Sequence, residues 1–180
     1  MPATFLNRIA GAARLDPRTY EDVEADGTAT GQAVAVIVLS SGATATGLML
    51  MRDASVDPYM FISYTAMALA AWMAWSALVY LIGVHLLPGP ETNATVGEVL
   101  RTTGFAAAPG MVRIFGVVPV VGPALFVLGS VWMLVAMFVA IRQALDYRHV
   151  TRALAVCVVG WLLSLLFVAI IGLLFARPVW

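Results

Sequence analysis

Residues 31–51 read GQAVAVIVLSSGATATGLMLM, and no acidic or basic side chain occurs between Asp26 and Arg52. A helix needs about 20 mostly apolar residues to cross the roughly 30 Å hydrocarbon layer of a membrane. This stretch meets that requirement and predicts a transmembrane helix near 32–51. Three further charge-free intervals predict transmembrane helices in the same way, near 59–86, 121–142 and 153–176.

A fifth apolar segment, near 96–118, differs from the other four. It contains three charged residues, Glu98, Arg101 and Arg113. Pro109 and Gly110 interrupt it, and proline removes a helical hydrogen bond and bends the helix. We expect a kinked or broken third span, with a re-entrant element or a surface helix as the alternatives.

The composition agrees with a membrane protein. Hydrophobic residues make up 62% of the chain and charged residues 11%, whereas soluble domains contain about 25% charged residues. Ten basic residues balance ten acidic ones, so no basic surface for nucleic acid is expected. The predicted fold is an all-α membrane protein: a five-helix transmembrane bundle with a kinked or broken third span and a short amphipathic N-terminal segment.

The arginines predict the topology, because basic residues are retained in cytoplasmic loops. Five spans and an internal N-terminus place seven arginines inside and three outside, whereas four spans would place the arginines of 142–152 outside. We therefore expect a cytoplasmic N-terminus and an external C-terminus, with a cytoplasmic interfacial segment at 1–31 and a membrane domain at 32–180. All basic residues are arginine, which is typical of GC-rich bacterial genomes, so the expected location is a bacterial plasma membrane.

The N-terminal segment is expected to form two short helices beside the membrane. Phe5, Leu6 and Ile9 share one helical face, which favours an interfacial anchor. Asp16 and Pro17 are a typical helix start, with a capping acceptor followed by proline at the first helical position. The alternative is a frayed tail.

Residues that carry chemistry are few. Asp146 and His149 are three residues apart, but two ligands do not make a zinc site. The chain has one cysteine, Cys157, and contains none of the serine-hydrolase, zinc-protease or phosphate-loop motifs. We therefore expect no catalytic residue, no metal and no cofactor. Asp146, Arg148 and His149 are instead candidates for structural or interaction roles in an inner loop.

Arg113 is the most unusual charge in the chain. It follows Arg101 by about 18 Å of helix and so lies within the outer half of the membrane. A charge there needs a partner or a route to the interface. We expect it to pair with Asp53 or Asp57, the carboxylates predicted on that side, and the alternative is an arginine that extends alone to lipid phosphates.

Small residues recur at helical spacing in two spans. Ala43 and Gly47 in the first span, and Gly160 and Ser164 in the last, are four residues apart, a spacing that lets helix backbones approach closely. Such faces serve either a homo-oligomer contact or packing within one bundle. Internal packing is favoured because a five-helix chain has many internal contacts to make.

Three segments carry a family resemblance: RLDPRTYEDVEADGTATGQA (14–33), VGEVLRTTGFAAAPGMVRIFG (96–116) and VWMLVAMFVAIRQALDYRHVTRALAVCVVGWLL (131–163). Together they resemble bacterial members of the Yip family of Ypt/Rab-interacting membrane proteins. The resemblance implies a five-span bundle with a cytoplasmic N-terminus. Eukaryotic relatives contact small GTPases, but this chain lacks their Asp-Leu-Tyr-Gly-Pro-type motif.

The functional prediction is a non-enzymatic scaffold, adaptor or accessory subunit. It would act through helix–helix and cytoplasmic-surface contacts with membrane lipids and with a membrane-protein partner or larger membrane complex. The alternative is a small transporter or lipid-handling protein that uses the broken third span.

Overall fold

The computed structural model describes residues 4–51, 57–118 and 120–175, with side chains described as far as Leu166. These residues contain seven α-helices and no strand. The helices are α1 (Phe5–Ala13), α2 (Pro17–Ala25), α3 (Ala29–Met51), α4 (Pro58–Tyr80), α5 (Val96–Phe105), α6 (Gly122–Ala144) and α7 (Val150–Phe175). A π-helix, Leu81–Leu86, continues α4, and a 3₁₀ helix, Ala108–Val117, follows α5. The all-helical class is confirmed.

Three of the described helices are long and apolar enough to cross a membrane: α3, α4 with its π-helical extension, and α6. They lie close to three of the predicted spans, although α3 begins at Ala29 instead of residue 32. Helix α7 runs for 26 residues, from Val150 to Phe175, and its side chains are described as far as Leu166. A five-span bundle stays a prediction, because the segment at 96–118 is not one continuous helix.

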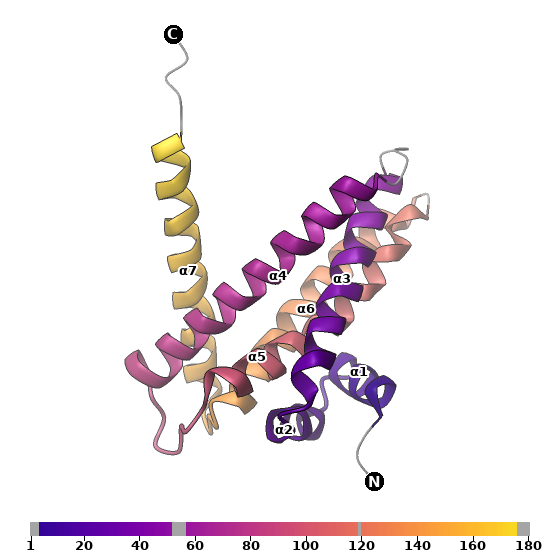
Figure 1. Cartoon of the computed structure of the whole chain (residues 1–180). Coiled ribbons are helices and arrows are strands. Elements are labelled where there is room, and N and C mark those ends of the chain that lie inside the picture. Colours follow the sequence, from indigo (N-terminus) through magenta and orange to yellow (C-terminus); the bar gives the residue numbers. More distant parts are fainter. Residues whose placement is uncertain (1–3, 52–56, 119, 176–180) are drawn as a thin grey trace.

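The helices are not all in the same bundle (Figure 1). Helices α3, α4, α5 and α6 pack together, and the short α1 and α2 lie at the lower end of α3. Helix α7 contacts α4 and α6 near its own beginning, through Ala153, Val156 and Cys157, and its far end diverges from α4. The backbone of α7 therefore packs against the bundle near its beginning and lies farther from α4 towards its end (Figure 1).

The break in the fifth segment lies before the position expected from the sequence. Helix α5 ends at Phe105, and Pro109 stands at the start of the 3₁₀ helix instead of in the middle of an α-helix. Pro109 has no backbone N–H to donate to the Phe105 carbonyl, and its ring would clash with that carbonyl in an α-helix, which explains why α5 does not continue through this position. The 3₁₀ helix then packs between α3 and α6.

The small residues of α3 serve this internal packing. A Cβ atom on Gly47 would lie 2.2 Å from the Arg113 carbonyl oxygen, and one on Gly110 would lie 2.2 Å from Ser40 Oγ. In α7, a Cβ atom on Gly160 would lie 3.0 Å from the Trp75 ring. The faces of α3 and α7 that carry Gly47 and Gly160 are therefore occupied by other parts of the same chain.

Substitution of Gly47 tests this close approach. Gly47→Ala should lower the free energy of unfolding by about 1–3 kcal/mol, because the added methyl group forces the 3₁₀ backbone away from α3. Gly31→Ala in the same helix is the control, since no atom lies within 4 Å of its added Cβ. The control should be neutral or stabilising by up to about 1 kcal/mol through helix propensity. Thermal unfolding in detergent, followed by circular dichroism, compares them, and equal stability of both variants would contradict the packing.

Candidate functional site at the charged face

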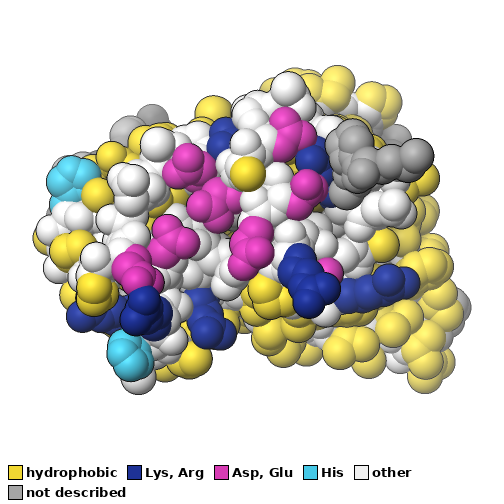
Figure 2. All heavy atoms as spheres, turned by 90° about the horizontal axis from the view of Figure 1, so that it is seen from below, with side chains coloured by type: hydrophobic (Ala, Val, Ile, Leu, Met, Phe, Trp, Pro, Cys, Tyr) yellow, Lys and Arg dark blue, Asp and Glu magenta, His cyan; other side chains and the backbone are white. Residues whose placement is uncertain are grey.

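Most charged residues gather at one end of the molecule, which we call the charged face. It is formed by α1, α2, the beginning of α5 and the connections 87–95 and 145–149. Figure 2 shows acidic side chains in the middle of this face, with arginines around them. The opposite end of α4 carries Asp57, whose carboxylate accepts a hydrogen bond from the Tyr59 amide at 3.0 Å and caps the helix.

The N-terminal helices begin with standard caps. Thr4 Oγ1 accepts from the Asn7 amide at 3.3 Å, and Asp16 Oδ1 accepts from the Arg18 amide at 3.1 Å, with Pro17 at the first helical position. The predicted helix start at Asp16 and Pro17 is therefore confirmed. These caps satisfy amides that a helix leaves without internal partners.

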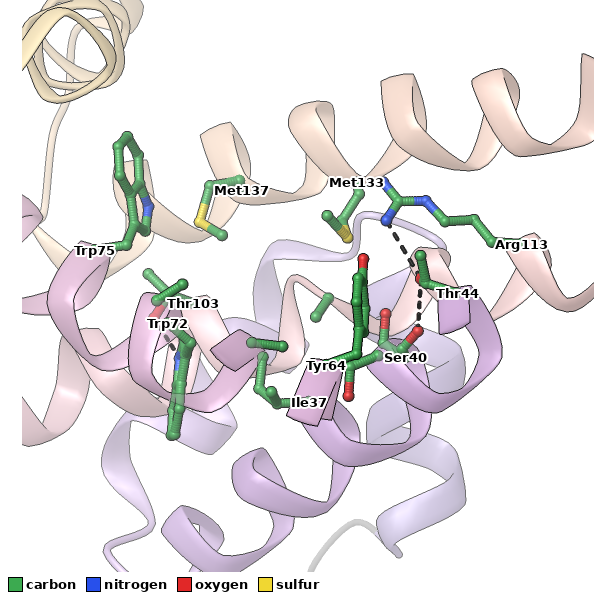
Figure 3. Close-up of a pocket in the computed structure, with 14 residues that line it drawn as sticks. Ile37, Ser40, Thr44, Tyr64, Trp72, Trp75, Thr103, Arg113, Met133 and Met137 are labelled. Atoms are coloured by element: carbon green, nitrogen blue, oxygen red, sulfur yellow. Dashed lines mark hydrogen bonds between the residues drawn. The ribbon is translucent and has the colours of Figure 1, made fainter. Parts of the chain in front are cut away.

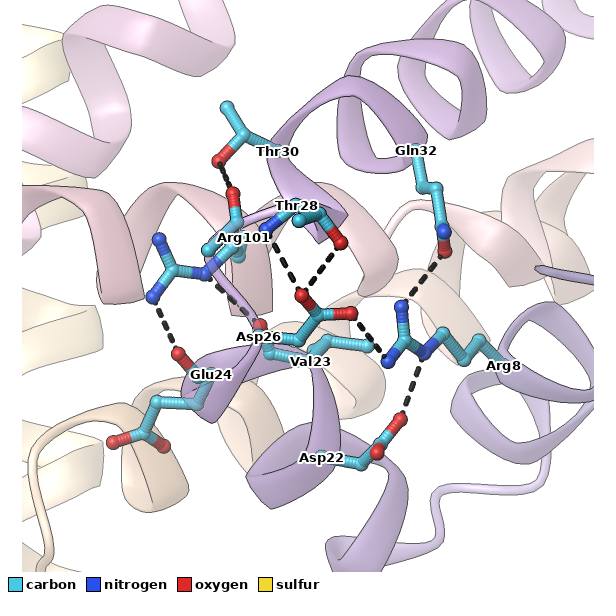
Figure 4. Close-up of polar contacts among 10 residues, drawn as sticks. Arg8, Asp22, Val23, Glu24, Asp26, Thr28, Thr30, Gln32 and Arg101 are labelled. Atoms are coloured by element: carbon cyan, nitrogen blue, oxygen red, sulfur yellow. Dashed lines mark hydrogen bonds and ion pairs between the residues drawn. The ribbon is translucent and has the colours of Figure 1, made fainter. Parts of the chain in front are cut away.

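Arg8 holds the two N-terminal helices to the beginning of α3 (Figure 4). Its side chain is only 3% exposed. Nε donates to Asp22 Oδ2 at 2.7 Å, Nη2 donates to Asp26 Oδ2 at 2.8 Å, and Nη1 donates to Gln32 Oε1 at 3.1 Å. Hydrogen bonds from Thr28 and Arg8 lower the pKa of Asp26 to about 2, so this carboxylate is charged at neutral pH. One guanidinium thus joins α1, α2 and α3.

Arg101 fixes α2 to α5. Its Nε donates to the Val23 carbonyl at 2.9 Å, and its Nη2 donates to the Glu24 carbonyl (Figure 4). These carbonyls belong to the last turn of α2, where no amide of the helix remains to bond them. The predicted site residue Arg101 is therefore a cap for another helix.

Apolar contacts complete the attachment of the N-terminal helices. Phe5 packs edge-on against Phe105, with ring centroids 6.5 Å apart, and Ile9 joins the same core. Tyr20 is fully buried and donates its hydroxyl proton to the Ala12 carbonyl at 3.1 Å. Leu6, by contrast, is 73% exposed. The packed helices disagree with a frayed tail, and the position of Leu6 at a membrane interface stays a prediction.

Carboxylates from separate elements meet between these attachments. Burial, with added repulsion from Asp146, Glu98 and Glu21, raises the pKa of Glu24 to about 7, and Arg101 opposes the shift only in part. The pKa of Asp146 is raised as well, by burial and by neighbouring carboxylates. Glu98 also closes a capping box with Thr95, whose amide donates to Glu98 Oε2 at 2.7 Å. This acidic group therefore spans α2, α5 and the end of α6.

The connection between α6 and α7 is tied to the connection before α5. Arg148 forms an ion pair with Glu91, with Nε 2.7 Å from Oε2. The Tyr147 hydroxyl donates towards two carbonyl oxygens, that of Gly83 in the π-helix at 3.1 Å and that of Leu87 just after it at 2.7 Å. His149 is exposed beside them. Among the described residues, no three His, Cys, Asp or Glu side chains are placed to hold a metal ion.

The other predicted site residues lie away from this face. Pro109 and Gly110 are buried in the 3₁₀ helix. The expected ion pair between Arg113 and Asp57 is wrong: the salt bridges of the described residues do not include Arg113, and Asp57 caps α4. Arg113 instead contacts Thr44 and the Phe126 ring. Asp53, the other expected partner, lies outside the described residues.

Sequence reasoning missed Arg8, the residue on which this face depends most. It lies in a short amphipathic helix, and its partners follow 14, 18 and 24 residues later. No local pattern links those positions. The one available signal was the concentration of carboxylates in α2 opposite a lone arginine of α1.

The fold and this face describe an all-helical membrane protein with a compact polar cap at one end of its bundle. The Yip1 domain model matches residues 15–172, so the chain belongs to the Yip1 domain family. Members of this family are non-catalytic membrane proteins that interact with other proteins. Comparisons with curated proteins and with solved structures each give no match.

Substitution of Arg8 tests the attachment of α1 and α2. Arg8→Gln should destabilise the protein by about 1–3 kcal/mol, because it removes hydrogen bonds to two charged groups. Proteolysis between α1 and α2 should accelerate at the same time. Arg18→Gln is the matched control, since the Arg18 side chain is exposed. If the two variants are cleaved and unfold alike, Arg8 does not hold these helices.

Proposed function

We propose that this protein is a non-enzymatic scaffold or adaptor of a bacterial plasma membrane, which binds a membrane-protein partner through its charged face. In this proposal the N-terminus is cytoplasmic, residues 1–31 form a cytoplasmic interfacial segment, and the charged face is the cytoplasmic face. Membership of a family whose proteins interact with other proteins supports this role.

The observation that carries the proposal is a group of three carboxylates at the centre of the charged face, on elements that are fixed to one another. Glu24, Glu98 and Asp146 come from three elements, and each element is held in place by an arginine contact or a helix cap. Cytoplasmic loops of membrane proteins are rich in arginine and lysine. A basic segment next to a partner's transmembrane helix therefore has the charge that this surface attracts.

The sides of the bundle supply the second contact. Helices α6 and α7 expose large apolar side chains to the membrane, among them Val127, Leu128, Leu162 and Leu165. These surfaces contact lipid, and in the proposal they also contact the partner's helices. An accessory subunit of a larger membrane complex uses the same two kinds of surface.

Neutralisation of the acidic group tests the proposal. The triple variant Glu24→Gln, Glu98→Gln and Asp146→Asn keeps the fold intact, because Gln still closes a capping box. Asn also tolerates the left-handed backbone of Asp146, where φ is 49°. Asp57→Asn is the matched control, since it removes a carboxylate at the other end of the molecule and preserves the helix cap.

The measurement is affinity purification in mild detergent with quantitative mass spectrometry. A membrane protein should co-purify with the wild type and with Asp57→Asn, and its yield should fall about ten-fold in the triple variant. Binding of that purified partner should strengthen between pH 6 and pH 8, because Glu24, with a pKa of about 7, gains its charge there. An unchanged yield with the triple variant would contradict the proposal, and solute flux by the protein alone in liposomes would favour a transporter instead.

A further inference from the structure

A cavity of about 270 Å³ lies inside the bundle, away from the charged face (Figure 3). Helices α3, α4, α5 and α6 and the 3₁₀ helix all contribute to its wall. One end is polar, with Ser40, Thr44, Tyr64 and Arg113. Figure 3 shows the Tyr64 side chain directed towards the region of the Arg113 guanidinium. Thr44 lies about 10 Å along α3 from its end at Met51, so this polar end is inside the bundle.

Arg113 makes few polar contacts with the described residues at this position. Its Nη1 donates a long hydrogen bond of 3.4 Å to Thr44 Oγ1, and its guanidinium lies 5.3 Å from the centre of the Phe126 ring. Nε is buried and has no hydrogen-bond partner among the described residues. Arginine carries five N–H donors, and a cation with free donors in apolar surroundings favours a bound anion.

The other end of the cavity is mostly apolar, apart from Thr103, and shares two wall residues with a second hollow. Trp75 and Met137 line the cavity, and they also line a groove of about 260 Å³ between α4, α6 and α7. The rest of that groove is apolar, with Leu134, Cys157 and Trp161 in its wall. The groove lies where α7 begins to diverge from α4, between residues of α4, α6 and α7. Methionine side chains adapt to chains of different shape, so Met137 forms a compliant boundary between the two hollows.

We propose that these two hollows together bind an anionic amphiphile, with its carboxylate or phosphate at Arg113 and its acyl chain along the groove beside α7. The charge of Arg113 and the hydroxyl groups around it select the headgroup. The apolar wall from Trp75 to Trp161 accepts the chain, which enters from the surrounding membrane. The volume of each hollow is close to the lower end of the roughly 300–1,000 Å³ range of ligand pockets. The two hollows together therefore suit an amphiphile with a single acyl chain, which would lie in the groove.

Photo-crosslinking of the purified full-length protein in neutral detergent tests this site. The probe is a palmitic acid analogue with a photoreactive group at the end of its chain, and its methyl ester is the uncharged counterpart. The acid should cross-link to the groove, at α6 or α7 near Leu134 or Trp161. Its affinity should exceed that of the ester about ten-fold or more, as expected for a charge-assisted hydrogen bond.

Variants at the two ends of the molecule separate the headgroup contact from general hydrophobic binding. Arg113→Gln should lower the affinity for the acid about ten-fold and leave that for the ester unchanged. Arg18→Gln, an exposed arginine of the charged face, is the matched control and should bind as the wild type does. Ala68→Phe keeps Arg113 but fills part of the cavity, so it should weaken binding of the acid. This second variant tests the site even if Arg113→Gln fails to fold.

The only cysteine, Cys157, reports occupancy of the groove independently. Palmitate should slow its alkylation by N-ethylmaleimide in the wild type, and the same protection in Arg113→Gln should require about ten-fold more palmitate. Displacement of the probe by phosphatidylglycerol would support the site with a membrane phospholipid as the source of the headgroup, and resistance to it would support a free fatty acid. Equal binding of acid and ester, cross-links outside α6 and α7, or displacement by inorganic phosphate alone would overturn the proposal.

Discussion

The buried guanidinium of Arg8 is the constraint on which the charged face depends. Removing a cation from water is unfavourable unless hydrogen bonds and opposite charges replace the lost hydration. Arg8 meets this need with Asp22, Asp26 and Gln32, which lie on α2 and α3. The N-terminal helices must therefore lie where these three groups converge. Because α2 is placed in this way, its Glu24 comes close to Glu98 and Asp146.

Arg113, which is half-buried, has a different environment. It lies within the bundle, and among the described residues its side chain contacts the Thr44 hydroxyl and the Phe126 ring. Arg8 is neutralised by carboxylates of its own chain, which fits a structural role. Among the described residues, Arg113 Nε has no hydrogen-bond partner beside the cavity, which fits the proposed recognition of an anion from outside the chain. The charged face is thus the proposed surface for protein contacts, and the cavity inside the bundle is the proposed site for an amphiphile.

Hydropathy alone located most of the long helices. Charged side chains are unfavourable in the hydrocarbon layer, so a membrane-spanning helix appears in the sequence as a long uncharged interval such as residues 31–51. Local capping signals were equally readable at Asp16 and Pro17. The α-helix ends at Phe105, four residues before Pro109, because Pro109 has no N–H to donate to the Phe105 carbonyl. The π-helix at Leu81–Leu86 had no signal in the sequence, and neither did the contact of its Gly83 carbonyl with the distant Tyr147 hydroxyl.

The candidate site was less predictable than the fold, because its contacts join elements that are far apart in the sequence. Glu98, Arg101, Asp146 and Arg148 were recognised as candidates by their charge, but their roles depend on contacts between elements far apart in the sequence. Arg148 pairs with Glu91 across 57 residues, and Arg101 reaches a carbonyl 78 residues away. Arg113 was assigned a carboxylate partner because the sequence does not show that Asp57 is engaged as a helix cap.

The central claim is that α1 and α2 are integral parts of the folded membrane protein. Hydrogen–deuterium exchange of the protein in lipid nanodiscs tests it most directly. Amides of residues 5–25 should be protected to an extent comparable with α5, because Arg8, Arg101 and Phe5 hold the helices to the bundle. Exchange of these amides at the rate of an unfolded chain, while α5 stays protected, would contradict the claim.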